Sequence, residues 1–592
     1  MTALDATLGR NRKAAAESGT ADAALAGSPC SQTAAAGSRA LTAPSIGRTA
    51  TVLQSAAALL WIPQAALLSL AVGQIASGAA MDRALLPAAG ILVLGIARAW
   101  LDRAGMQSAF RAARGQLTAL RADAVAGLAR RSPLDATRPS SGLVAGTLAE
   151  QAEAVVPYRA RFEPLRHKAT VVPLAILACV LAYSWAAALI LLVAAPLIPV
   201  FMALIGWRAK EASEKQLAEM GDMNAFLLDR LRGMATIRTF DAVDRTARHL
   251  RTTAETLRVR TMAVLRIAFL SSAVLELFAA LGVAMVAVYV GFHLLGQLDF
   301  GAWGGKLTLG EGLFILLLAP AFFEPLRDLS SVWHDRAAGQ AALDAIAKVT
   351  ADGPEIAGGL DDARPAPAEA AAPAVRIEDL RFRHNGAAAP VFDGLALDIA
   401  AGEHVALMAP TGYGKSTLLA LIAGLAVPDA GTVRIGGTAL DGATAGALRA
   451  RMAWIGQAPH LFSGTLSGNV ALGRPGIGTA ETAKALRTAR LDHLADRRGS
   501  AALGEEGAGI SGGEALRLAV ARAVANARAG LILADEPTAH LDRETADEIS
   551  DMLVRVAAGR TLIVATHDPV LAARMDRTVL LPDIAEGREG RT

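Results

Sequence analysis

Long stretches without a charged residue constrain this chain more than any other feature of its sequence. No Asp, Glu, Lys or Arg occurs from Thr49 to Met81, or in the 39 residues from Ala169 to Trp207. A helix that crosses a bilayer needs about 20 apolar residues. The first window is long enough for one span. The second would be about 58 Å long as a single helix, close to twice the hydrocarbon thickness of a bilayer. It is therefore predicted to form two spans that turn near Tyr183–Trp185.

Three further windows with few charges complete a prediction of six spans. They are the window from Ala84 past Arg98 to Trp100, the window from Ile267 to Leu298 that contains Glu276, and the window from Gly310 to Leu329 that contains Glu311, Glu324 and Arg327. The last of these carries the most charge and has the weakest hydropathy signal.

Composition agrees with a membrane protein that has a soluble portion. Hydrophobic residues make up 53% and charged residues 19% of the chain, and the mean hydropathy is +0.37. These values argue against a wholly soluble protein and exclude a disordered or fibrous one. The net charge of +3 is too small to indicate nucleic-acid binding. Two cysteines, Cys30 and Cys179, cannot form a disulfide framework, which indicates a reducing compartment around the soluble part.

Changes in composition divide the chain into five segments. We expect a disordered tail at 1–48, a membrane domain at 49–349, a Pro/Ala/Gly-rich linker at 350–374, an α/β domain with a largely parallel sheet at 375–582, and a short tail at 583–592.

The distribution of Lys and Arg predicts the orientation of the spans. Residues 102–168 carry eleven of them and residues 208–266 carry twelve, whereas the opposite side carries only Arg83 and Lys306. Basic residues near span ends stay in the cytoplasm, so both long loops and both termini are predicted to be cytoplasmic. Helix-like stretches at 111–131 and 210–232 are expected to extend the spans into the cytosol.

A phosphate-binding loop follows an apolar strand at 404–408. Backbone N–H groups of such a loop cradle phosphates at a helix N-terminus, the lysine reaches the β- and γ-phosphates, and the following hydroxyl ligates Mg²⁺. The predicted ATP-binding residues are Ala409, Pro410, Thr411, Gly412, Tyr413, Gly414, Lys415, Ser416 and Thr417. Ala409 stands where glycine is usual, and its methyl group is tolerable if φ there stays negative.

Two carboxylates follow a second apolar strand, Leu531 to Ala534. Asp535 is predicted to hold Mg²⁺ with Ser416, and Glu536 to activate the attacking water as a general base. An apolar strand followed by Asp-Glu is by itself an ordinary strand end. Its place 120 residues after Lys415, with the loop intact, favours the catalytic interpretation.

A second anion site is predicted where Ser511, Gly512, Gly513 and Glu514 open a helix. Gly-Gly before a helix is more often a simple turn. However, the chain's own nucleotide already has a cradle, so this site is expected to serve the ATP of a partner domain. Two further residues follow strands: Gln457, predicted to contact Mg²⁺, and His567, predicted to contact the γ-phosphate.

Together these motifs resemble the ATP-binding cassette domain over residues 375–582. His384 stands where that family has a tyrosine that stacks on adenine, so stacking is expected to be weaker or to involve Phe382. Six spans fused ahead of one cassette resemble a type IV exporter half-transporter. This resemblance implies an all-α membrane domain joined to an α/β phosphate-loop domain, ATPase activity, and a second half that completes both ATP sites.

Strings in the membrane domain resemble the CydD-type subunits of bacterial thiol-reductant exporters. They lie at 195–210, 226–242, 260–281 and 312–329, and a fifth lies at 504–514. The resemblance implies a heterodimer with a CydC-type subunit in the inner membrane. It also implies export of cysteine or glutathione to the periplasm in support of cytochrome bd assembly. Haem has been linked to the same family and remains an alternative substrate.

Ionisable residues within the spans are the candidates for a substrate site. Arg98 and Glu276 are predicted to bind a zwitterionic thiol such as cysteine, with Glu324, Arg327 and His293 as further candidates. The competing interpretation is snorkelling or a salt bridge between helices. Cys179 lies in an apolar run and is expected to be a small core residue.

Two alternative functions remain open from the sequence. One is an exporter of haem, lipid or a drug with the same architecture. The other is a mainly structural or regulatory half whose partner hydrolyses ATP. Glu536 and His567 argue against the regulatory half, while Ala409, His384 and Glu514 favour it.

Overall fold

The structure is a computed structural model that describes most of the chain as two compact units. The described residues are 48–78, 81–197, 200–201, 223, 226–227, 229–231, 233–303, 305–359, 371–387, 389–474, 476–498, 501, 503 and 510–581. The membrane unit comprises 1–120 and 155–339, and the cassette unit comprises 121–154 and 340–592. The predicted tails lie outside the described residues, except for Arg48. Residue 582, the predicted end of the cassette domain, also lies outside them.

Long apolar helices make up the membrane unit. Among the described residues, five helical segments are long and apolar enough to cross a membrane, and a shorter apolar helix spans Trp185–Leu197. The helices are α2 (Arg48–Leu59), α3 (Trp61–Ala76), η1 (Met81–Ala84), α4 (Leu85–Arg130), α6 (Val155–Pro157), η3 (Tyr158–Phe162), α7 (Glu163–Tyr183), α9 (Met234–Thr239), α10 (Val243–Leu294), α11 (Leu309–Ser331) and α12 (Trp333–Val349). Ser184 separates α7 from the shorter helix, which places the turn in the predicted segment. The predicted stretch 210–232 falls largely outside the described residues.

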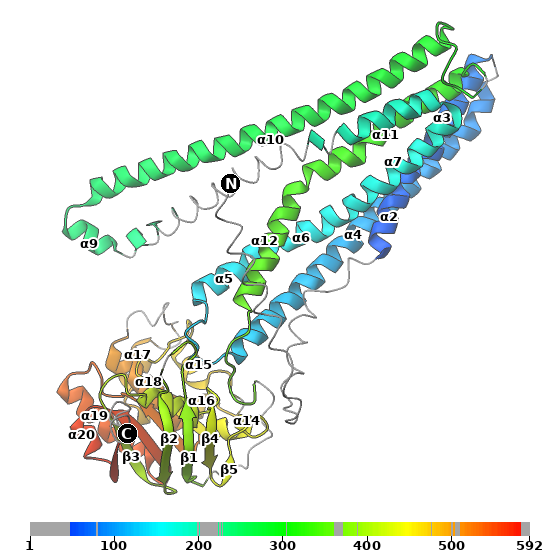
Figure 1. Cartoon of the computed structure of the whole chain (residues 1–592). Coiled ribbons are helices and arrows are strands. Elements are labelled where there is room, and N and C mark those ends of the chain that lie inside the picture. The colour runs from blue at the N-terminus through cyan, green and yellow to red at the C-terminus, as the bar shows by residue number, and fades with distance from the viewer. Residues whose placement is uncertain are drawn as a thin grey trace, which may run out of the picture. The chain divides into compact units, whose positions relative to one another are not determined.

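Two helices are much longer than a bilayer is thick. α4 has 46 residues and α10 has 52, so they are about 69 and 78 Å long. Figure 1 shows α10 meeting α11 near one end and extending away from it toward α9. The apolar part of α4 lies in its first half and its arginines accumulate in the second half. This agrees with the prediction that the spans continue beyond the membrane.

The core of the membrane unit forms around α11, which contacts α3, α7 and α10. Small and aliphatic side chains fill it, among them Ile176, Leu191 and Ile315. Gly282 of α10 allows close packing, because a Cβ there would lie 2.5 Å from the Phe323 ring of α11. Lipid tails are as apolar as these side chains, so the hydrophobic effect does not drive helices together inside a bilayer. Close packing of a small residue against a large one provides van der Waals contacts that do.

Two sheets form the cassette unit (Figure 1). An antiparallel sheet has the order β2-β1-β4-β5, and a parallel sheet has the order β6-β7-β8-β3-β9. The strands are β1 (Val375–Phe382), β2 (Phe392–Ile399), β3 (His404–Met408), β4 (Ala430–Ile435), β5 (Thr438–Ala439), β6 (Met452–Ile455), β7 (Leu531–Asp535), β8 (Thr561–Thr566) and β9 (Arg577–Leu580). The parallel sheet confirms the predicted α/β class.

Both faces of the parallel sheet are buried. Along β7, Leu531 and Leu533 join one hydrophobic cluster, whereas Ile532 and Ala534 join the other. Side chains alternate between the faces of a strand, so a strand buried on both sides is a continuous apolar run. The helices of this unit are α5 (Ser141–Ala149), η2 (Gln151–Ala154), α13 (Lys415–Ile422), α14 (Ala445–Arg449), α15 (Leu466–Ala471), α16 (Thr479–Thr488), α17 (Asp492–Arg498), α18 (Gly512–Ala525), α19 (Arg543–Ala557) and α20 (Pro569–Ala572).

The loop after α4 packs into the cassette unit, so the compact units differ from the predicted domains. Arg131 donates to the Asp135 carboxylate from Nε at 3.0 Å, and their side chains are 7% and 0% exposed. Ser132 Oγ donates to the carbonyl of Leu425, which follows α13. Hydrogen bonds and burial, neither of which the composition reveals, thus assign residues 121–154 to the cassette unit.

The first part of the predicted linker is also packed. Ile356 N donates to the Arg130 carbonyl at 2.8 Å, and Ala357 N donates to the Gly424 carbonyl at 3.0 Å. Arg449 donates to the Ala357 carbonyl at 2.6 Å. Residues 360–370 of the predicted linker lie outside the described residues.

Candidate functional site

Four neighbouring parallel strands bring most of the predicted ATP-site residues to one edge of the sheet. The strand order is β6-β7-β8-β3. Gln457 follows β6, Asp535 ends β7, His567 follows β8 and the loop from Ala409 follows β3. Carboxyl ends of parallel strands are where α/β sheets bind ligands.

The loop between β3 and α13 has the backbone of a phosphate cradle. Gly412 and Gly414 have φ values of 92° and 86°. A Cβ at Gly414 would lie 2.5 Å from Val391 Cγ1, so a larger residue would not fit there. Ala409 is not among the described non-glycine residues with positive φ. Its methyl group therefore meets the condition under which the sequence departure is tolerable.

Lys415 is buried and held in place by this loop and by Glu536. Its Nζ donates to the Ala409 carbonyl at 2.7 Å and to the Pro410 carbonyl at 3.3 Å. It also lies 3.3 Å from Glu536 Oε1, and the two side chains are 6% and 12% exposed. The Lys415 ammonium group thus lies within the phosphate loop and contacts the Glu536 carboxylate. A phosphate bound there would compete with this carboxylate for the ammonium group.

Ser416 and Asp535 form a pair of hard oxygen ligands. Ser416 Oγ donates to Asp535 Oδ1 at 2.9 Å. Burial raises the pKa of Asp535, and the neighbouring Glu536 charge adds to this, while the Ser416 hydrogen bond opposes it. A hydroxyl and a carboxylate suit Mg²⁺, which prefers oxygen ligands. The residues present therefore fit the predicted ion.

Glu536 adopts a strained backbone conformation. Its φ is 46°, which costs about 1–2 kcal/mol for a residue with a Cβ. Its N–H donates to the Ala565 carbonyl at 2.8 Å, and its Oε2 lies 2.6 Å from Nδ1 of His567. Its carboxylate contacts both Lys415 and His567, and strained residues of this kind cluster at functional sites.

The three remaining residues that were predicted to lie near the nucleotide differ in their exposure. Gln457 is exposed and lies beside the end of β7, because Ile455 pairs with Ala534. Phe382 is 7% exposed within a hydrophobic cluster, so it is not accessible for stacking on a base. His384 is half-buried, with Nε2 3.3 Å from Thr417 Oγ1. Of the two side chains, His384 is the one positioned near the phosphate loop.

Ser511 caps the helix α18, and Glu514 completes the cap. Glu514 N donates to Ser511 Oγ, while Ser511 N and Oγ both donate to Glu514 Oε2 at 2.9 Å. His493 Nε2 and Arg497 Nη2 lie 3.2 and 3.5 Å from Glu514 Oε1. Burial alone would raise the pKa of Glu514, but hydrogen bonds from Ser511 and His493 outweigh it and lower the pKa. Gly512 and Gly513 begin the helix behind this cap.

Arg98 and Glu276, both predicted to bind substrate, have different surroundings in the membrane unit. Glu276 accepts from Arg327 Nη1 at 3.1 Å through both oxygens. Arg98 instead lines a pocket whose carboxylate is Glu324. Helix spacing alone does not reveal which of two acidic residues faces a given arginine.

The remaining membrane candidates have structural surroundings. His293 is 1% exposed and accepts from Leu307 N at 3.2 Å. Cys179 packs partly buried against the core cluster, as expected of a small core residue. Neither lines the pocket.

Sequence reasoning missed Trp61 and Lys168 in the pocket and His493 and Arg497 beside Glu514. Lys168 marks the edge of an uncharged window and was counted only as a topology signal. Trp61 lies inside such a window, where an aromatic residue carries no signal of its own. The partners of Glu514 lie on α17, about 20 residues away in sequence, so no local spacing connects them.

Comparisons with known proteins agree with this geometry. Residues 392–539 match the family described as "ABC transporter", and residues 168–318 match "ABC transporter transmembrane region". The glutathione/L-cysteine transport system ATP-binding/permease protein CydD of Haemophilus influenzae is 36% identical over 442 residues, 74% of this chain and 73% of that protein. The CydC protein of the corresponding Bacillus subtilis system is 29% identical over 535 residues, 90% of each chain. A bacterial Atm1-family ABC exporter with ATP bound superposes with a TM-score of 0.71 at 23% identity, covering 93% of this chain and 94% of that one.

Proposed function

This chain belongs to the ABC transporter family, among the CydD-type ATP-binding/permease proteins, and on that premise we propose that it is one half of a heterodimeric thiol exporter. It moves cysteine and glutathione from the cytoplasm to the periplasm and so supports assembly of cytochrome bd. Its partner is a CydC-type subunit. The relatives' transport of glutathione and L-cysteine supports the substrate, and the higher identity to CydD than to CydC supports the assignment of the subunit.

The observation that carries the proposal is that the residues predicted to hydrolyse ATP gather at one sheet edge. Lys415, Glu536 and His567 are linked by contacts of 3.3 and 2.6 Å, and Ser416 is bonded to Asp535. Mg²⁺ held by Ser416, Asp535 and Gln457 would neutralise phosphate charge. A merely regulatory half would have no need of this set.

ATP binding rearranges the contacts around Lys415. The phosphates compete for its ammonium group and for the N–H groups of the loop, so Lys415 leaves Glu536. Glu536 is then free to accept a proton from the attacking water, and His567 contacts the γ-phosphate. His384 stacks on the adenine in the place of the usual tyrosine.

The signature residues act on the partner's nucleotide. Ser511 and Gly513 lie at the start of α18, and Ser511 Oγ is engaged by Glu514 rather than by the chain's own phosphate loop. A helix N-terminus attracts phosphate, so closure of two cassettes over ATP would draw Ser511 toward the partner's γ-phosphate. The helix α4 runs from the membrane unit into the cassette unit and would carry this closure to the spans.

The proposed orientation follows the basic residues. The chain is a multi-pass protein of the inner membrane, and its cassette unit and both termini are cytoplasmic. The orientation is inferred because most of the Lys and Arg residues near the spans lie in the two long loops. The last residues of α10 and the first of α11 face the periplasm in this arrangement.

Transport by the purified heterodimer tests the proposal. Inside-out proteoliposomes of this chain with its CydC-type partner should accumulate labelled cysteine and glutathione when ATP is added. Glu536→Gln should abolish accumulation, whereas Glu544→Gln, the same change at an exposed site on α19, should not. Uptake of neither thiol by a complex that hydrolyses ATP would contradict thiol export, and haem would be the next substrate to measure.

A further inference from the structure

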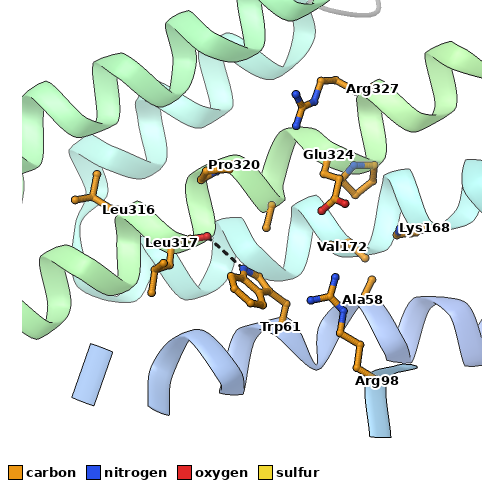
Figure 2. Close-up of a pocket in the computed structure, with 12 residues that line it drawn as sticks. Ala58, Trp61, Arg98, Lys168, Val172, Leu316, Leu317, Pro320, Glu324 and Arg327 are labelled. Carbon is orange, nitrogen blue, oxygen red and sulfur yellow. Dashed lines mark hydrogen bonds between the residues drawn. The ribbon is translucent and has the colours of Figure 1, made fainter. Parts of the chain in front are cut away.

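A pocket of about 360 Å³ lies among the helices of the membrane unit. Its lining comes from α2, α3, α4, α7 and α11 (Figure 2). The volume falls within the range of about 300–1,000 Å³ that is usual for small-molecule sites. The pocket adjoins the part of α11 that contains Pro320 and Pro325 within the helix.

Four charged residues line this pocket, and two of them already have ionic partners. Arg327 is bonded to Glu276 at 3.1 Å, and Lys168 lies 3.7 Å from Asp328. The other two are Arg98 and Glu324, which form no ion pair with any residue that the structure describes. Their side chains point into the same space from opposite sides (Figure 2).

An unpaired charge at membrane depth is costly unless it faces water or a ligand. Arg98 is fixed by a cation–π contact, with its guanidinium 5.5 Å from the centre of the Trp61 ring. The Trp61 ring is fixed in turn, because its Nε1 donates to the Leu317 carbonyl at 3.2 Å (Figure 2). The guanidinium is therefore held in position without consuming its charge.

The rest of the lining is largely apolar, with Val172, Leu316 and Pro320 among the side chains. Besides the two cations that are already paired, the pocket thus offers one further cation, one carboxylate and an apolar wall. A molecule with one carboxylate and one ammonium group close together would satisfy both charges. It would place its less polar part against the wall.

We propose that this pocket binds the free α-amino-acid end of the exported molecule, with Arg98 on the α-carboxylate and Glu324 on the α-ammonium group. This inference rests on the proposed thiol export. Cysteine and glutathione differ in size and in the distance from this end to the thiol. Each nevertheless has one carbon that bears both a free ammonium and a free carboxylate group. A site for that shared end explains how one transporter accepts both.

Binding of cysteine analogues to the purified heterodimer in detergent tests the assignment. Labelled cysteine is displaced by unlabelled cysteine, by N-acetylcysteine, which lacks the ammonium charge, or by cysteamine, which lacks the carboxylate. Each analogue should bind roughly 10- to 100-fold more weakly than cysteine, since a hydrogen bond to a charged group contributes about 1.5–3 kcal/mol.

Two variants should remove this selectivity in opposite ways. Glu324→Gln should lose the preference for cysteine over N-acetylcysteine and keep the preference over cysteamine. Arg98→Gln should do the reverse. Glu324→Asp and Arg98→Lys keep the charges and should restore selectivity in part, which guards against misfolding of the neutral variants. Glu255→Gln is the matched control, because it removes a carboxylate of α10 that lies outside the pocket, as does its ionic partner Arg258, and it should leave both ratios unchanged.

The outcomes separate the pocket from the transport function. If the wild-type vesicles export thiols but neither ratio changes in the two variants, or if Glu255→Gln changes them instead, the pocket assignment is wrong and thiol export stands. If the ratios change as expected but no thiol is exported, the pocket is correct and thiol export fails. If the wild-type complex does not distinguish the analogues, the pocket assignment is overturned.

Discussion

The sheet edge of the cassette unit and the pocket of the membrane unit differ in whether their charged side chains have partners within the protein. At the sheet edge, Lys415 is paired with Glu536, and Ser416 with Asp535. In the pocket, Arg98 and Glu324 have no ionic partner among the described residues. The difference indicates two modes of binding. ATP must displace contacts within the protein, whereas the transported molecule would supply contacts that the protein lacks.

Removing the Glu536 carboxylate from the sheet edge should have the largest effect of all, on the rate of ATP hydrolysis. Glu536→Gln should lower ATP hydrolysis by about 10²- to 10⁴-fold, the usual contribution of a general base, because the amide cannot accept the proton of water. The rate of phosphate release from the heterodimer measures this. ATP binding should persist in the variant. A loss smaller than about tenfold would mean that the partner's composite site carries the turnover.

Breaking the buried Arg131–Asp135 pair of the cassette unit should have the next largest effect. This effect is on stability and not on the rate of ATP hydrolysis. Asp135→Asn leaves Arg131 buried without its counter-charge, at a cost of about 3–5 kcal/mol. The thermal inactivation of the heterodimer should therefore shift to lower temperature. Asp398→Asn is the control, since the pair of Asp398 and Arg376 is exposed and contributes about 0–1 kcal/mol. Equal shifts in the two variants would show that burial of the first pair has no energetic weight.

The base-binding position should respond more modestly. His384→Tyr should tighten ATP binding by a few-fold and His384→Ala should weaken it, because stacking on a base contributes about 1–3 kcal/mol. Fluorescent-nucleotide titration of the heterodimer measures both. Phe382→Leu keeps the core filled and serves as the control. An effect on affinity from Phe382→Leu but not from His384→Ala would transfer the stacking role to Phe382.

The smallest expected effect is a dependence on pH. The folded-state pKa of Glu514 lies below its ordinary value, so its contribution to stability is complete above the ordinary carboxyl pKa of about 4.3. This contribution is lost as the pH falls through the folded-state value. Wild type should lose thermal stability below about pH 4.3 more steeply than Glu514→Gln. Parallel curves for the two proteins would contradict the proposed role of the Glu514 contacts.

The fold of each unit was largely predictable from local patterns. Apolar windows longer than a bilayer indicated the spans, and an apolar strand followed by the loop from Ala409 to Thr417 indicated the parallel sheet. The extent of the compact units was not predictable. It depends on bonds such as that from Ser132 to Leu425, which joins residues 293 apart in the sequence.

The sequence by itself predicted the residues that gather at the sheet edge, because Asp535 ends a strand, the loop from Ala409 and His567 follow strands, and parallel strands end at one edge of the sheet. Only the tertiary structure decided which membrane charges meet. Glu276 and Glu324 are equivalent by composition, yet helix packing places one against Arg327 and the other in the pocket with Arg98. The physical reason is that the rotation of each helix about its axis depends on contacts with its neighbours, which no single helix encodes.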